Sequence, residues 1–306
     1  PTVNIINSNV EINEALISNT ATAEDEHDVI AGYHALEFML WGQDLNEDGS
    51  ADTLNARDSS GGQRPLTDFT TDQYADRRIL YLQVVAAKLV ADLQGVRDGW
   101  VEGASYRTAF TTVADEDEAK QKLTEILTGM GTLSEGELAG ERMQISFSSN
   151  SQEDEHSCFS DNTHRDIWLN AEGIANSFYG VYNGFDTNND ALDDNTTRQV
   201  DGYGLDDYLT DAGLTDLRDR MTAALTSTET AYTEIDTSAR NGQPVDTLIQ
   251  DNVRTADNPM YKTIIALNAQ SAIIAEGATT LGIDDTVVDD DASECDTTAP
   301  DQECGG

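Results

Sequence analysis

Residues 72–94 read DQYADRRILYLQVVAAKLVADLQ, and their apolar side chains recur at steps of three and four residues. That spacing places them along one stripe of an α-helix, whereas strand side chains alternate every second residue. The same spacing recurs in five further segments: 28–41, 116–130, 164–182, 212–235 and 254–281. Because no alternating pattern of comparable length is present, the sequence predicts an all-α protein.

Segments rich in Gly, Asp and Asn separate these helices and are predicted to be connections: 42–68, 134–140, 148–163, 184–204 and 240–244. A chain of 306 residues exceeds the usual size of one domain. We therefore predict two helical-bundle domains, 1–140 and 141–283. Residues 284–306 are acidic and lack apolar periodicity, so they are predicted to form a flexible tail.

The chain is strongly acidic, with 58 Asp and Glu against 17 Lys and Arg and a net charge of −41. Such a charge repels nucleic acid and anionic lipid headgroups, so no nucleic-acid partner is expected. The simplest interpretation is a solvated surface suited to salty water. A cation-handling function is compatible with the same charge.

Two of the three cysteines, Cys295 and Cys304, are predicted to form a disulfide in an oxidising compartment. Cys158 is predicted to be a small buried residue. No stretch reaches the roughly 18 apolar residues of a membrane span, so no transmembrane segment is expected. The chain begins at Pro1 without a methionine or a signal peptide, and we expect a mature, processed product.

The tetrapeptide EDEH occurs at 24–27 and again at 153–156, and a further histidine follows each copy. All four histidines of the chain belong to these two segments: His27, His34, His156 and His164. LWGQDLNEDG at 40–49 also resembles VYNGFDTNND at 181–190. We interpret the two halves as diverged duplicates and expect a polar site between them.

The first predicted helix carries two stripes. At 100° per residue, its polar stripe comprises His27, His34, Glu37 and Trp41, and the opposite stripe, predicted to face the core, comprises Val29, Tyr33, Leu36 and Leu40. His34 and Glu37, three residues apart, can direct an imidazole nitrogen and a carboxylate at one point, as Glu-x-x-His pairs do in di-iron bundles. The alternative is an ordinary surface pair.

The second histidine segment offers further candidate ligands: Glu153, His156, Asp161, His164 and Asp166. SDNT before HRDI is a plausible N-cap, which places His164 in the first turn of a helix. Imidazole and carboxylate together suit iron, zinc or manganese. For His156 and His164, the alternative is a structural hydrogen bond to a neighbouring carboxylate.

Two loops have the ligand spacing of a calcium site. The first contains Asp44, Asn46, Asp48, Ser50 and Asp52, and the second contains Asp186, Asn188, Asp190 and Asp194. Asn55 replaces the usual bidentate Glu in the first loop, and Ala191 replaces the usual Gly in the second. Ordinary Asp/Asn turns are the alternative.

A GxHxxE signature lies in GYHALEFMLWGQDL at 32–45. The chain resembles the imelysin-like family, or M75 peptidase family, in its iron-regulated IrpA-type branch. The resemblance rests on this segment, on GGQRPLTDF at 61–69 and on QEDEHSCFSDNTHRDI at 152–167. The resemblance implies two helical bundles, export to the periplasm or outer membrane, a role in iron acquisition, and a metal site at Gly32, His34 and Glu37. Family members usually have a further helical segment before this motif. Only 31 residues precede Gly32, so either the first bundle is incomplete or upstream residues have been removed.

The family's peptidase label raises the possibility of a metal-dependent hydrolase. The sequence has no HExxH motif and no Gly-x-Ser-x-Gly motif. We therefore expect a protein that binds a transition metal (Fe or Zn) or a small ligand, with a membrane-associated iron-uptake partner. An M75-type peptidase, a haem binder using His34 or His164 and a peptide-binding module are the alternatives.

Overall fold

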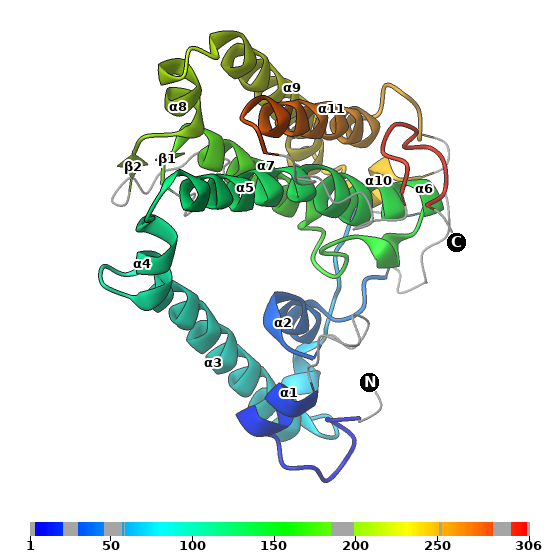
Figure 1. Ribbon diagram of the computed structural model, residues 1–306. Coiled ribbons are helices and arrows are strands. Elements are labelled where there is room, and N and C mark those ends of the chain that lie inside the picture. The colour runs from blue at the N-terminus through cyan, green and yellow to red at the C-terminus, as the bar shows by residue number, and fades with distance from the viewer. Residues whose placement is uncertain are drawn as a thin grey trace. The chain divides into compact units, whose positions relative to one another are not determined.

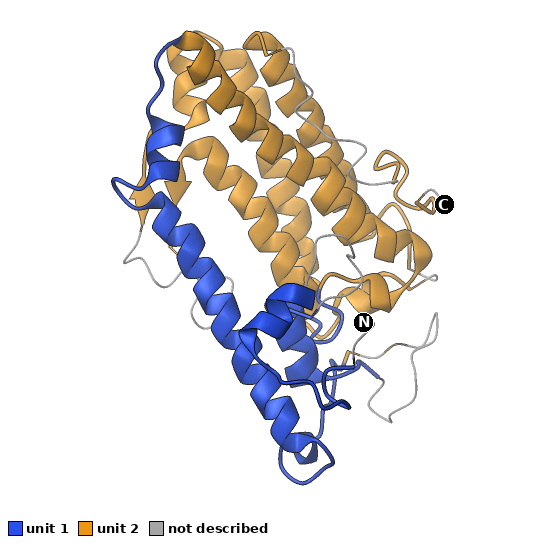
Figure 2. Ribbon diagram, turned by 60° about the horizontal axis from the view of Figure 1, so that its bottom comes forward, with its two compact units in different colours: residues 1–52, 60–115, 157–161 blue, residues 53–59, 116–156, 162–306 orange. Residues whose placement is uncertain are grey.

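The computed structural model describes residues 4–20, 30–45, 57, 59–184, 199–250, 253–283 and 295–304. These residues are mostly helical (Figure 1), so the prediction of an all-α protein is confirmed. Within them, the strands β1 (Val181–Tyr182) and β2 (Val200–Asp201) form one short antiparallel ladder. The chain divides into two compact units (Figure 2). Unit 1 comprises 1–52, 60–115 and 157–161, and unit 2 comprises 53–59, 116–156 and 162–306.

Unit 1 is built around the long helix that the first quoted stretch predicts. Its elements are α1 (Glu14–Thr20), α2 (Gly32–Trp41), the 3-10 helix η1 (Leu66–Phe69), α3 (Ala75–Trp100) and α4 (Ser105–Thr111). Arg77 of α3 fixes the N-terminal segment by donating hydrogen bonds to the carbonyls of Ile5, Ile6 and Val10. The Tyr81 hydroxyl donates to the carbonyl of Ile30 at 2.7 Å, and burial raises the pKa of Tyr81 to about 12.

The buried face of α2 differs from the predicted core stripe. Tyr33 is 64% exposed and Leu40 is 50% exposed, whereas Ala35 and Met39 are buried with the unit 1 core. Leu36 is partly buried against that core. The helix is therefore rotated from the predicted orientation, because its contact with α3 is made through small and flexible side chains and not through the bulkiest ones.

Helix α3 exposes much of its apolar surface. By length and composition it is long and apolar enough to cross a membrane, and little of its most apolar stretch is buried. The core helix of a folded unit passes the same test, and α3 packs against α1, α2 and η1, with Tyr81 and Val85 buried in the unit 1 core. The expectation of no transmembrane segment therefore stays a prediction.

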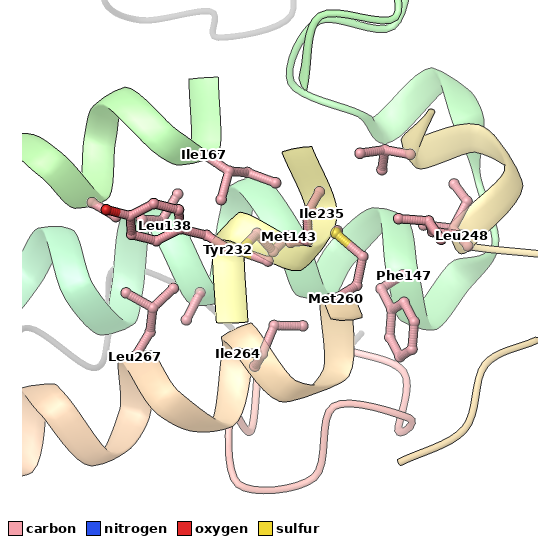
Figure 3. Packing of buried hydrophobic residues seen from close by; sticks show 14 residues of the cluster. Leu138, Met143, Phe147, Ile167, Tyr232, Ile235, Leu248, Met260, Ile264 and Leu267 are labelled. Atoms are coloured by element: carbon pink, nitrogen blue, oxygen red, sulfur yellow. The ribbon is translucent and has the colours of Figure 1, made fainter. Parts of the chain in front are cut away.

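Unit 2 is a bundle of long helices around two apolar clusters. Its helices are α5 (Glu116–Thr132), the π-helix η2 (Leu133–Gln144), α6 (Ile145–Ser149), the 3-10 helix η3 (Gln152–Asp154), α7 (Thr163–Tyr179), α8 (Leu205–Asp211), α9 (Thr215–Arg240), α10 (Val245–Leu248) and α11 (Pro259–Thr280). In one cluster, Tyr232 and Ile235 of α9 pack with Ile264 of α11 (Figure 3). The other cluster surrounds Phe178 and Leu209.

The prediction of a connection at 134–140 is wrong. These residues belong to a helical run that continues from α5 through η2 into α6. Ser134, Gly136, Ala139 and Gly140 are buried there, so close helix packing outweighs the low helix propensity of Gly and Ser. Residue 140, the predicted domain boundary, lies inside this run, and the predicted division at that residue stays a prediction.

Residues 295–304 pack against η2 and α11 within unit 2, although the sequence predicts a flexible tail. Cys295 and Cys304 form a disulfide, which confirms the predicted pairing. The buried Gln144 amide lies within hydrogen-bond distance of the carbonyls of Asp296, Ala299 and Gln302, and Asn268 of α11 donates to Thr297 Oγ1 at 2.8 Å. Cys158 is buried, as predicted. The internal repeat stays a prediction, because the first EDEH copy lies outside the described residues.

Candidate metal centre

Helix α2 brings two predicted ligands of unit 1 together. His34 Nδ1 lies 2.8 Å from Glu37 Oε2, and the two side chains are 35% and 12% exposed. Gly32 begins the helix with φ +84°, a left-handed conformation that L side chains rarely adopt. A Cβ at this position would meet no atom within 4 Å, so crowding does not require a glycine here. The backbone conformation therefore explains the glycine of the GxHxxE motif.

Ser160 fixes the other oxygen of Glu37. Glu37 Oε1 accepts hydrogen bonds from the Ser160 backbone N–H at 3.0 Å and from Ser160 Oγ at 2.7 Å, across 123 positions of sequence. Oε1 is thus held by the protein, while Oε2 is directed toward His34. Metal-binding carboxylates are commonly oriented by outer hydrogen bonds of this kind.

The pair fits a transition metal. Metal–ligand bonds of about 2.0–2.2 Å place two ligands on one ion roughly 3 Å apart. The 2.8 Å between His34 Nδ1 and Glu37 Oε2 is close to that separation. An imidazole nitrogen and a carboxylate oxygen together suit iron, zinc or manganese.

The segment 61–64 joins the end of α2 to residues 157–161. Gly62 N–H donates to the Phe159 carbonyl at 2.8 Å, and Arg64 N–H donates to the Trp41 carbonyl at 2.8 Å. The Arg64 guanidinium donates to the Phe38 carbonyl at 2.9 Å. The Phe38 and Phe159 rings meet edge to face, with centroids 4.9 Å apart. These contacts position Ser160 beside Glu37.

We expect Gly62→Ala to destabilise unit 1 by about 1–3 kcal/mol, because no added atom fits there. A Cβ at this position would lie 2.7 Å from the Trp41 carbonyl oxygen and 2.9 Å from that of Gly42, both backbone atoms. Urea unfolding followed by tryptophan fluorescence in a Trp168→Phe background measures this, because the two remaining tryptophans lie in unit 1.

The matched control is Gly95→Ala, in the exposed half of α3. A Cβ there meets nothing within 4 Å, so alanine should stabilise the helix by about 0.5–1 kcal/mol. Equal effects of the two substitutions would contradict the assigned role of Gly62.

Asp44 and Asp161 also approach each other within unit 1. One carboxylate oxygen of each lies within 4.8 Å of the other, and Asp44 is 7% exposed. Asp161 adopts φ +55°. Trp41, predicted to line a cleft, is 42% exposed. The other predicted residues of the first half and of the calcium loops lie outside the described residues: His27, Asn46, Asp48, Ser50, Asp52, Asp186, Asn188, Asp190 and Asp194.

The remaining candidates lie in unit 2, each beside a carboxylate. His156 Nδ1 is 3.0 Å from Asp166 Oδ2, and His164 Nε2 is 3.9 Å from Asp236 Oδ1. Glu153 is exposed on η3. The hydrogen bond to a neighbouring carboxylate that the sequence left as an alternative is thus present for His156, whereas the 3.9 Å between His164 and Asp236 is longer than a hydrogen bond. Metal binding by His156 and His164, and a pocket shared by all four histidines, stay predictions.

Sequence reasoning missed two residues that lie beside candidate ligands, and one of them, Ser160, orients its ligand by hydrogen bonds. Ser160 holds Glu37, and Asp236 neighbours His164. Ser160 adjoins the predicted ligand Asp161, but no local pattern links it to α2. Asp236 lies one residue beyond the predicted helix 212–235. The chain contains many Asp residues, so nothing in the sequence distinguishes this one as a neighbour of His164.

Comparison with known proteins identifies the family. No curated protein matches the chain. The family model for imelysin, Peptidase M75, matches residues 6–273, which include the GxHxxE motif, the segment 61–64 and the Ser160 region. Membership fits a metal-binding or iron-related protein. This chain belongs to the imelysin family, peptidase family M75.

Proposed function

We propose that this protein is an exported metal-binding protein of the IrpA-type branch that serves bacterial iron acquisition. Its site is His34 and Glu37, and its metal is iron or zinc. The observation that carries the proposal is the divided role of the Glu37 carboxylate, with Oε1 held by Ser160 and Oε2 at 2.8 Å from His34 Nδ1. A solvated surface pair does not require such support.

The disulfide supports export. Cys295 and Cys304 are joined, and disulfides persist mainly in oxidising compartments such as the periplasm or the outer cell surface. A membrane-associated iron-uptake protein is the proposed partner there. Calcium binding at the loop that begins with Asp44 is a separate structural proposal.

The same geometry disfavours a peptidase. A general base must reach its substrate or water within hydrogen-bond distance. With Oε2 proposed to bind the metal and Oε1 held by Ser160, neither oxygen of Glu37 is left to take a proton from water. Glu37 is therefore proposed as a ligand and not as a base.

Isothermal titration of Zn²⁺, and of Fe²⁺ under anaerobic conditions, tests the proposal. The double variant His34→Ala/Glu37→Gln should abolish high-affinity binding of the metal. Ser160→Ala should weaken it about 10–100-fold, because one orienting bond is lost while the ligands remain. Glu125→Gln is the matched control, since Glu125 also belongs to an i,i+3 pair, with Lys122 at 2.8 Å on α5. Unchanged affinity in the double variant would refute the site.

A further inference from the structure

A cavity within unit 2 lies apart from the His34–Glu37 pair. Its volume is about 500 Å³, which is within the range of small-molecule sites. Residues of one face of α7, from Arg165 to Tyr179, and of α9, from Leu225 to Tyr232, form its walls. The face of α7 that lines it extends over roughly 21 Å, at 1.5 Å per residue, so the cavity is elongated.

The lining is acidic. Its carboxylates are Glu172, Asp201, Asp206, Asp207 and Glu229. Among the described lining residues Arg165 is the one basic side chain, and its Nη1 lies 3.7 Å from Asp236 Oδ1, a carboxylate that offsets its charge. The cavity therefore attracts cations.

Aromatic rings stand beside these carboxylates. Trp168 and Tyr232 meet edge to face with centroids 5.0 Å apart, and Tyr179 lines the same cavity. The pKa of Tyr232 is raised by burial and, to a smaller extent, by the charge of Glu229. Burial raises the pKa of Tyr179, and the charges of Asp206 and then Glu229 raise it further, against a hydrogen bond with Thr222 that lowers it. Glu229 thus acts on both tyrosines. The Trp168 ring already carries a cation, because the Arg165 guanidinium lies over it at 5.3 Å from the centroid, and rings beside carboxylates are the combination that favours organic cations.

Two buried acceptor atoms among the lining residues have no hydrogen-bond donor within the described chain. Gln270 is 2% exposed, and its Nε2 donates to Ser134 Oγ at 2.8 Å, but its Oε1 receives no hydrogen bond. Asp206 Oδ1 is in the same situation. Both atoms are closed off from solvent, so the cavity offers a ligand with N–H donors the other oxygens of its five carboxylates.

We propose that this cavity binds a linear organic cation that carries primary or secondary ammonium groups. The carboxylates compensate its charge, the rings contact its methylene stem, and its N–H groups donate to oxygens of the lining carboxylates. A bare metal ion lacks the stem, and a quaternary ammonium lacks the donors. This inference is independent of the metal proposed at His34.

Titration of the whole protein with spermidine in 0.5 M NaCl tests the inference, because salt screens the diffuse attraction of the acidic surface. In a Trp41→Phe/Trp100→Phe background, the fluorescence of Trp168 reports occupancy of the cavity directly. We expect saturable binding. The double variant Asp206→Asn/Glu229→Gln should weaken it at least tenfold.

The matched control is Asp216→Asn/Glu234→Gln, which removes the same two charges from exposed positions on α9 outside the cavity. It should leave the affinity within about twofold. Pentane-1,5-diamine should bind, whereas its hexamethyl derivative, which has the same charge and no N–H, should bind at least tenfold more weakly. A blocked Lys-Lys dipeptide that binds more tightly than spermidine would identify a peptide side chain as the source of the cation.

Three outcomes would overturn the inference. They are the absence of saturable binding, equal losses in the two double variants, and equal affinity for the amine and its hexamethyl derivative. Circular dichroism of each variant shows that a loss of binding is not a loss of fold, since the Asp→Asn and Glu→Gln changes conserve side-chain volume.

Discussion

Replacing Asp236 with alanine is expected to lower the free energy of unfolding of unit 2 by about 3–5 kcal/mol. Asp236 is 3% exposed, and its Oδ2 accepts a hydrogen bond from Arg240 Nε at 2.6 Å. Its Oδ1 lies 3.7 Å from Arg165 and 3.9 Å from His164. Removing the carboxylate leaves the buried charge of Arg165 poorly compensated, which is the costly way to break a buried pair.

Asp216→Ala is the matched control, because Asp216 lies on the same helix and pairs with an arginine four residues later. Its side chain is 90% exposed and that of Arg220 is 41% exposed, so solvent screens the pair and its removal should change stability far less than the loss of Asp236. Urea unfolding with Trp168 as the single tryptophan measures both changes. Comparable losses for the two variants would show that burial does not decide the contribution of Asp236.

The helical architecture could be predicted because periodicity is a local property. The stretch 72–94 predicts α3, whose observed bounds are Ala75–Trp100, and 212–235 predicts α9 at Thr215–Arg240. The connection at 240–244 lies between α9 and α10, as predicted. Helix ends shift by several residues because caps and tertiary contacts, and not the apolar stripe, set them.

The run 134–140 could not be recognised as helix from its composition. Its glycines and serine favour turns in isolation, and only the packing of α11 against η2 makes their small size an advantage. The orientation of α2 fails for a related reason. A stripe of bulky residues predicts the buried face of a helix only when the neighbouring helix packs against that stripe. In α2, the smaller Ala35 and the flexible Met39 are buried instead.

The candidate site, like the fold, could be predicted from the sequence only in part. His34 and Glu37 are three residues apart, so their approach follows from helix geometry. The contact between Glu37 and Ser160 closes a loop of 123 residues, and the contacts of Gly62 and Arg64 join three separate segments. No spacing rule reaches across such separations. The ligands of a site are therefore easier to predict than the residues that orient them.

Phe178→Ala is expected to cost about 3–5 kcal/mol, the loss typical of a large buried aromatic side chain. Phe178 is fully buried in the cluster that includes Leu209 and Ile274. Its ring packs edge to face against that of Tyr179, with the ring centroids 4.9 Å apart. Truncation leaves a void that rigid neighbouring helices fill only in part. Urea unfolding with Trp168 as the single tryptophan should show a lower midpoint with little change in slope.

Leu169→Ala, on the same helix but 54% exposed, should change stability by no more than about 0.5 kcal/mol.

A small loss of stability in Phe178→Ala would mean that the surrounding helices collapse into the void. Tyr179 would then move, because its ring rests on Phe178, and the affinity for spermidine would fall. A large loss of stability with unchanged spermidine affinity would instead show that the cavity wall keeps its shape. The two measurements together therefore separate the contribution of this core to stability from its contribution to the cavity.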